Sequence, residues 1–143
     1  MRAKQVVVIV CAVGFVAAAS LRAQGPRTVW DGVYTDAQAE RGAKAYDANC
    51  STCHGAEMRA GAGAPSLAGP EFSFGWDKKA LGGLFDFIKA NMPPGQAGSL
   101  KDQDYADIVA AIVKRNGAPS SPTATLPATK ADLDSITFLA DKP

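Results

Sequence analysis

Five consecutive residues carry the clearest chemical pattern of this sequence: Cys50, Ser51, Thr52, Cys53 and His54. Two thiols separated by two residues can reach the two vinyl groups on one edge of a porphyrin and form thioether bonds. The histidine that directly follows the second thiol is then held next to the macrocycle, where its imidazole can ligate the iron. The spacing therefore predicts one covalently bound haem c, with His54 as the proximal iron ligand.

Two other uses of a cysteine pair were weighed against haem attachment. A thioredoxin-like dithiol requires a strand before the motif and a helix that opens at it, whereas the stretch before Cys50 has a helical pattern that ends there. A structural zinc site prefers four Cys or His ligands. His54 is the only histidine, and the third cysteine, Cys11, lies in an apolar N-terminal segment that we expect to be removed. Haem attachment is favoured over both.

The second axial position of the iron has one good candidate, Met92. Met58 lies four residues after His54, and four residues span at most about 14 Å, too little to pass round the macrocycle and return over its other face. Met92 lies much further along the chain, in a loop stiffened by Pro93 and Pro94. The alternative is that Met92 only fills the core, as methionine often does. Histidine and methionine together occupy both axial positions, which disfavours oxygen chemistry and leaves one-electron transfer.

Helices are expected to position these residues. Apolar side chains at three-to-four spacing predict helices over residues 36–49, about 79–90 and 100–115. Thr35 is the expected N-cap of the first, with Gln38 completing a capping box, and Asp77 is the expected cap of the second. Gly42 inside the first helix suggests close contact with another helix, because glycine costs roughly 1 kcal/mol there relative to alanine. The pattern indicates an all-α fold.

The segment between the first two helices is expected to build the haem pocket. Residues 55–69 are rich in Gly, Ala and Pro, which predicts an irregular loop on the proximal side of the haem. A backbone carbonyl near Pro65 could accept a hydrogen bond from the far nitrogen of His54 and so fix its tautomer. We interpret the aromatic residues that follow as pocket wall or core rather than as a substrate platform: Phe72, Phe74 and Trp76.

The first 23 residues have the three regions of a secretory signal peptide. Arg2 and Lys4 precede an apolar run over residues 6–19, and small residues follow up to Ala23. We expect cleavage after Ala23, with positions 19 and 20 as alternatives, and therefore a periplasmic protein. The apolar run of about 14 residues is shorter than the roughly 20 that span a bilayer, so an uncleaved anchor is the less favoured alternative and no stable membrane span is expected.

The length and the charge exclude several classes of protein. A chain of 143 residues is enough for one domain. Removal of residues 1–23 would leave 12 basic and 14 acidic residues and a net charge of −2, so no basic patch for nucleic acid is expected. We divide the rest of the chain into an extended leader at 24–34, a domain at 35–117 and a Pro/Thr-rich C-terminal extension at 118–143 that packs on the domain.

The order of these features resembles the class I monohaem cytochromes c. The resemblance covers residues 35–117, where the helix ending in the cysteine motif, the Gly/Pro loop, Asn91-Met92-Pro93-Pro94 and the closing helix follow one another. It implies three main helices around one covalently attached haem. It also implies that Gly42 and Tyr46 cross the closing helix near Ile108 and Ile112, and that the carbonyl of Pro65 holds His54.

The resemblance implies a periplasmic one-electron carrier and not an enzyme. Residues 76–117 further resemble cytochrome c domains and subunits found with bacterial periplasmic quinoprotein (pyrroloquinoline quinone) dehydrogenases, which suggests such a dehydrogenase as donor and a terminal oxidase or another cytochrome as acceptor. Two alternatives remain at this point. An open distal site would make the protein a haem enzyme or gas sensor. A permanent electron-transfer subunit of a larger dehydrogenase or oxidase complex would use the leader and the tail as attachment arms.

Overall fold

A computed structural model describes residues 26–61 and 63–143, so the expected signal peptide lies outside the described residues. The described chain is mostly helical, which confirms the helical architecture predicted from the periodicity. Its helices are α1 Asp36–Asn49, α2 Ser51–His54, α3 Pro70–Trp76, α4 Leu81–Asn91, α5 Asp102–Arg115 and α6 Lys130–Leu133. No helix among the described residues is both long and apolar enough to cross a membrane.

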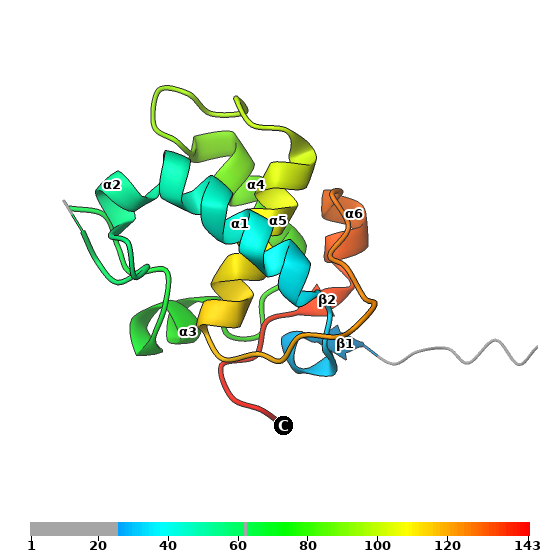
Figure 1. Ribbon diagram of the computed structural model, residues 1–143. Helices are drawn as coiled ribbons and strands as arrows, with labels where there is room; N and C mark the ends of the chain where they lie inside the picture. The colour runs from blue at the N-terminus through cyan, green and yellow to red at the C-terminus, as the bar shows by residue number, and fades with distance from the viewer. Residues whose placement is uncertain (1–25, 62) are drawn as a thin grey trace, which may run out of the picture.

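The crossing of α1 and α5 is the largest contact between helices (Figure 1). Gly42 lies at the crossing point, where a Cβ atom built on it would come within 1.7 Å of the backbone oxygen of Asp107. Only glycine allows the two helices to approach this closely, so the predicted close contact at Gly42 is confirmed. The buried carboxylate of Asp107 is satisfied at the same place by Arg41, whose Nε lies 2.7 Å from it.

The start of α1 differs from the prediction in one respect. Thr35 is the N-cap and its hydroxyl accepts a hydrogen bond from the backbone N–H of Gln38. The side chain of Gln38 does not return to the cap, so the predicted capping box is wrong. The Gln38 side chain is fully buried and instead forms hydrogen bonds with both the carbonyl and the N–H of Leu126 in the C-terminal segment. A long-range partner has replaced the local one.

The segment before α4 also differs from the prediction. Residues 70–76 form a helix, α3, which opens with Pro70 at a position where the missing N–H costs nothing. Asp77 does not cap the next helix, because α4 begins later, after Ala80. The carboxylate of Asp77 accepts a hydrogen bond from the backbone N–H of Ala140, 3.0 Å away. The cap prediction for Asp77 is therefore wrong.

The leader and the tail are built into the core and do not project as arms. Two short parallel strands, β1 Arg27–Thr28 and β2 Ile136–Thr137, pair the two ends of the described chain (Figure 1). A short 3-10 helix, η1 Val29–Asp31, follows β1. Apolar side chains from both segments are almost fully buried: Val29, Val33, Tyr34, Leu126, Leu133, Ile136 and Phe138. Over the described residues, the leader and the tail are therefore not exposed arms, and their attachment to a larger complex stays a prediction.

Candidate functional site

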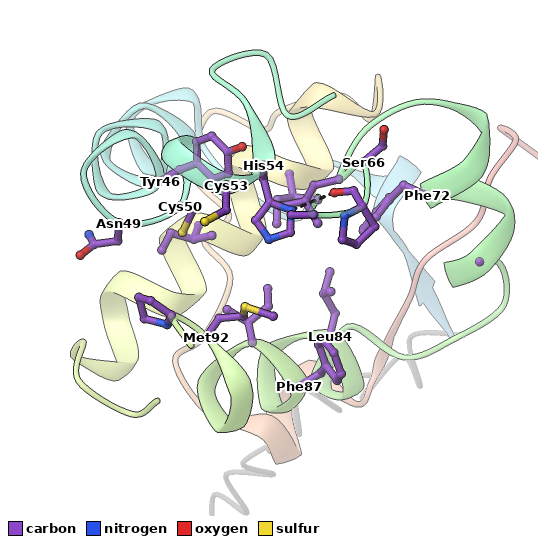
Figure 2. Close-up of a pocket in the computed structure, with 18 of the residues that line it drawn as sticks. Tyr46, Asn49, Cys50, Cys53, His54, Ser66, Phe72, Leu84, Phe87 and Met92 are labelled. Carbon is purple, nitrogen blue, oxygen red and sulfur yellow. Dashed lines mark hydrogen bonds between the residues drawn. The ribbon is translucent and has the colours of Figure 1, made fainter. Parts of the chain in front are cut away.

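A cavity of about 800 Å³ lies between α1, α2 and the following loop on one side and α4 with the Met92 loop on the other (Figure 2). This volume is in the range of pockets that hold small molecules and cofactors. Seven of the residues singled out from the sequence line it: Cys50, Cys53, His54, Pro65, Phe72, Trp76 and Met92. The tertiary structure thus brings together residues that are up to 42 positions apart in the sequence.

The end of α1 presents the two thiols at one end of the cavity. Cys50 is the C-cap of α1 and the residue from which α2 starts, and Cys53 lies on the single turn of α2. Both are free cysteines, with Cys50 half-buried and Cys53 exposed. Burial raises the pKa of the Cys50 thiol, and the neighbouring Cys53 adds to the effect. A reactive dithiol requires a lowered pKa, so this environment disfavours thioredoxin-like chemistry.

His54 is buried and its ring is oriented by the loop that follows it. Its Nδ1 lies 2.8 Å from the backbone oxygen of Pro65. A carbonyl oxygen can only accept, so Nδ1 carries the proton and donates it. In this tautomer of the neutral imidazole, the other ring nitrogen, Nε2, carries the free lone pair that a metal ligand requires. Figure 2 shows the ring of His54 directed into the cavity.

Met92 reaches the cavity from the opposite side. It ends α4, where its N–H donates to the carbonyl of Ile88 at 2.8 Å. Its own carbonyl accepts a hydrogen bond from the hydroxyl of Tyr105, 3.2 Å away on α5. In Figure 2 its thioether faces His54 across the cavity. Met58, in contrast, is buried in the core and does not line the cavity.

Apolar side chains form most of the remaining wall. Phe72 and Trp76 come from α3 and lie on the cavity side, with their ring centroids 6.2 Å apart. Phe74 points away and is 87% exposed, so its assignment to pocket or core is wrong. Several other wall residues were not predicted to line the pocket, although most of them belong to the apolar stripes of the predicted helices: Leu84, Phe87, Ile88, Ile108 and Ile112. Phe87 lies off the stripe and had no sequence signal.

Tyr46 also lines the cavity and ties α1 to the loop after the motif. Its hydroxyl donates to the carbonyl of Gly55, 2.6 Å away. Burial raises the pKa of Tyr46 to about 12, so the phenol stays neutral and remains a donor at physiological pH. This contact fixes the backbone directly after His54.

The donor set of the cavity fits a c-type haem. Two free thiols lie at one end, an imidazole nitrogen and a thioether face each other, and the walls between them are apolar. Among the described residues, no group of three or more His, Cys, Asp or Glu side chains could hold a metal ion by itself. A haem brings four nitrogen ligands of its own, so the chain would need to supply at most two more, for which His54 and Met92 are the candidates.

Comparison with known protein families agrees with this geometry. The family model described as cytochrome c oxidase, cbb3-type, subunit III, matches residues 37–110, just over half of the chain. The chain belongs to this family. It is therefore a cytochrome c domain, for which a covalently bound haem c and haem-based electron transfer are typical. No curated protein and no solved structure matches the chain.

The family match covers most of the helical domain described above. The match begins one residue inside α1 and ends within α5, so it includes the motif, Met92 and all the cavity-lining residues except Ile112. Domains of this kind typically carry electrons or act as subunits and do not catalyse bond-making reactions. The leader and the tail beyond Ala110 lie outside the match, although both belong to the same buried core.

Proposed function

We propose that this cytochrome c domain is a periplasmic one-electron carrier whose haem c is bound through Cys50 and Cys53 and ligated by His54 and Met92. A single observation carries the proposal: His54 and Met92 line facing sides of one cavity, with both thiols at its end. When bound, a haem supplies reversible Fe(II)/Fe(III) chemistry, and two strong axial ligands leave no position for oxygen.

The residues of the chain would hold both ligands still during electron transfer. The Pro65 carbonyl orients the imidazole of His54, and Tyr105 together with the end of α4 holds the backbone of Met92. Little movement is then needed between the two oxidation states. The apolar walls exclude water, which raises the reduction potential by disfavouring the more charged oxidised state.

The location and the partners are further parts of the proposal. The N-terminal signal pattern supports export to the periplasm. The resemblance of residues 76–117 to cytochromes found with quinoprotein dehydrogenases supports such a dehydrogenase as donor, with a terminal oxidase or another cytochrome as acceptor. A carrier of this kind would dock only transiently, through an interface at the small end of the protein–protein range.

Replacement of the sixth ligand tests the proposal. In the purified holoprotein, Met92→Ala should abolish the weak red absorption band of methionine-ligated ferric haem and allow the reduced protein to bind carbon monoxide. The volume-conserving control Met58→Leu should leave both properties unchanged. If the wild-type reduced protein already binds carbon monoxide readily, the distal site is open, and a gas sensor or haem enzyme becomes the better assignment.

The family description supports a second candidate, a permanent subunit of a larger complex. That description names a subunit of a cbb3-type oxidase, so the same haem chemistry would then serve electron transfer inside a stable complex. Size-exclusion chromatography of the native protein, extracted under mild conditions, separates the two roles. Elution at the size of the single chain supports a free carrier, and co-elution with other redox subunits supports the subunit role.

A further inference from the structure

Asn116 is the C-cap of α5, and its side chain makes hydrogen bonds that reach beyond this helix. Its Nδ2 donates to the carbonyl of Ile112 at 2.8 Å and to the carbonyl of Leu67 at 3.0 Å. Its Oδ1 accepts from the N–H of Gly69 at 3.0 Å and from the hydroxyl of Ser73 at 3.2 Å. All four hydrogen-bonding positions of the amide are therefore used.

These bonds hold the loop that orients His54. Leu67 is fixed on both sides, because its N–H donates to the carbonyl of Met58 at 2.8 Å while its own carbonyl is held by Asn116. Pro65, whose carbonyl meets Nδ1 of His54, lies only two residues before Leu67. Asn116 itself is not part of the cavity lining. Asn116 therefore contacts the loop that supports His54 and does not line the cavity itself.

We propose that Asn116 is a positioning residue whose side-chain amide holds residues 67–69 so that the Pro65 carbonyl keeps its bond to His54. The inference rests on the proposed function, in which His54 is an iron ligand. A histidine ligand that donates its second ring N–H to a carbonyl has a fixed ring orientation and higher basicity. Asn116 therefore acts on the iron through two intermediate groups, the loop and the carbonyl.

The chemistry of the amide explains why asparagine suits this position. Two carbonyl oxygens need a donor and two N–H or O–H groups need an acceptor, and a primary amide supplies both at once. Asn116→Asp keeps the shape but turns a carboxylate oxygen toward the carbonyls of Leu67 and Ile112, two acceptors that it cannot satisfy. This near-isosteric change is therefore the sharpest test, and it accompanies Asn116→Ala.

Two control variants separate positioning from general stability. Asn91→Ala removes an exposed asparagine whose side chain makes one local bond, to the carbonyl of Phe87 in its own helix. Ser73→Ala removes only the hydroxyl bond to Asn116 and leaves the bonds to Leu67 and Gly69 in place. Neither variant should loosen the contact between Pro65 and His54.

The measurement is hydrogen exchange by NMR in the reduced, diamagnetic holoprotein. Asn116→Asp and Asn116→Ala should accelerate exchange of the His54 Nδ1–H by about tenfold relative to the backbone N–H of Ile108, which lies beside Gly42 at the α1–α5 crossing, as the loss of a supporting hydrogen bond predicts. Both controls should leave the ratio of the two rates unchanged.

Two results would overturn the inference. One is an unchanged exchange ratio in the Asn116→Asp protein, and the other is equal acceleration of both protons, which would mark a purely structural role. The proposed function fails on different evidence, namely carbon monoxide binding by the wild-type protein, because that reaction reports on the opposite face of the cavity.

Discussion

At the scale of single residues, Gly42 sets the distance between α1 and α5. We predict that Gly42→Ala lowers the free energy of unfolding by about 3 kcal/mol, at the upper end of the usual cost of overpacking, because the added methyl group would meet backbone atoms of Asp107 that cannot move aside. Urea unfolding of the holoprotein followed by circular dichroism measures the change.

Gly83 supplies a matched control for this prediction. It lies on the exposed face of α4, where an added Cβ would meet only one ring atom of Trp76, 4.0 Å away. Gly83→Ala should therefore stabilise the protein by about 0.5–1 kcal/mol, the usual gain inside a helix. Equal stability of the Gly42→Ala and Gly83→Ala proteins would contradict the assigned role of Gly42.

Two buried tyrosines predict a loss of stability at high pH. Burial raises the pKa of both Tyr34 and Tyr46 from 10.0 to about 12. Below pH 10 the folded and unfolded chains both keep these protons. Between pH 10 and 12 the unfolded chain releases them first, so the free energy of unfolding falls as the pH rises through this window.

The tyrosine contribution can be isolated with Tyr34→Phe and Tyr46→Phe. Each change removes a hydrogen bond, to Ala118 or to Gly55, and should lower stability at every pH. Each should also flatten the decline between pH 10 and pH 12 in urea unfolding experiments, compared with the wild type. A double variant with an undiminished decline would show that other groups cause it.

At the scale of elements, Gln38 fastens the C-terminal segment to α1. Its Nε2 donates to the carbonyl of Leu126 at 3.0 Å, and its Oε1 accepts from the N–H of Leu126 at 2.8 Å. Gln38→Ala leaves two buried backbone groups without partners, which should lower the free energy of unfolding by about 2–4 kcal/mol. Gln96→Ala, at an exposed position, should have almost no effect.

Hydrogen exchange can locate the damage of the Gln38→Ala change. We expect faster exchange at Leu126 and at Ser121, whose N–H donates to the carbonyl of Tyr34 at 2.7 Å. Amides at the crossing of α1 and α5 should change less, because that contact does not depend on the tail. Uniform acceleration through the whole chain would argue against a separate fastening of the C-terminal segment.

At the scale of the whole molecule, the haem is expected to supply the centre of the core. Without it, the apolar walls of a cavity of about 800 Å³ would face water. The Cys50→Ala/Cys53→Ala protein, purified without haem, should therefore have lost most of the helical far-UV circular dichroism of the holoprotein. A well-resolved helical spectrum from that variant would refute the prediction.

The charge distribution predicts how the whole molecule meets a redox partner. Three segments that line the cavity carry no Lys, Arg, Asp or Glu, namely residues 48–56, 60–70 and 90–100, although charged residues make up 20% of the chain. Among the described residues that line the cavity, Glu71 is the only Lys, Arg, Asp or Glu. Electron transfer through a rim with so few charges should depend little on salt, unlike electrostatically steered association.

Electron self-exchange between two copies of the protein tests this directly, because both copies present the same rim. We expect its rate, measured by NMR in mixed oxidation states, to change by less than about threefold between low and high ionic strength. Gln96→Lys places a positive charge on an exposed residue of the loop that follows Met92. This variant should react more slowly at low salt and recover as salt is added.

The features that the sequence determined by itself are those encoded by neighbouring residues. Cys50, Cys53 and His54 predict the attachment site because they lie within five consecutive residues, and the bounds 36–49 of α1 follow from its periodicity and from the cap at Thr35. Chain reach alone separated Met92 from Met58. Local geometry constrains each of these features, so one stretch of chain is enough to infer them.

The tertiary structure decided what depends on contacts between distant segments. The side chain of Gln38 bonds Leu126, 88 residues away, and not the cap of its own helix, and the side chain of Asn116 bonds Leu67, 49 residues away. Phe72 faces the cavity while Phe74 faces solvent, because α3 turns between them. The physical reason is the same in each case. A buried side chain contacts or hydrogen-bonds whichever group the fold brings close to it, and the residues next to it in the sequence do not reveal which group that is.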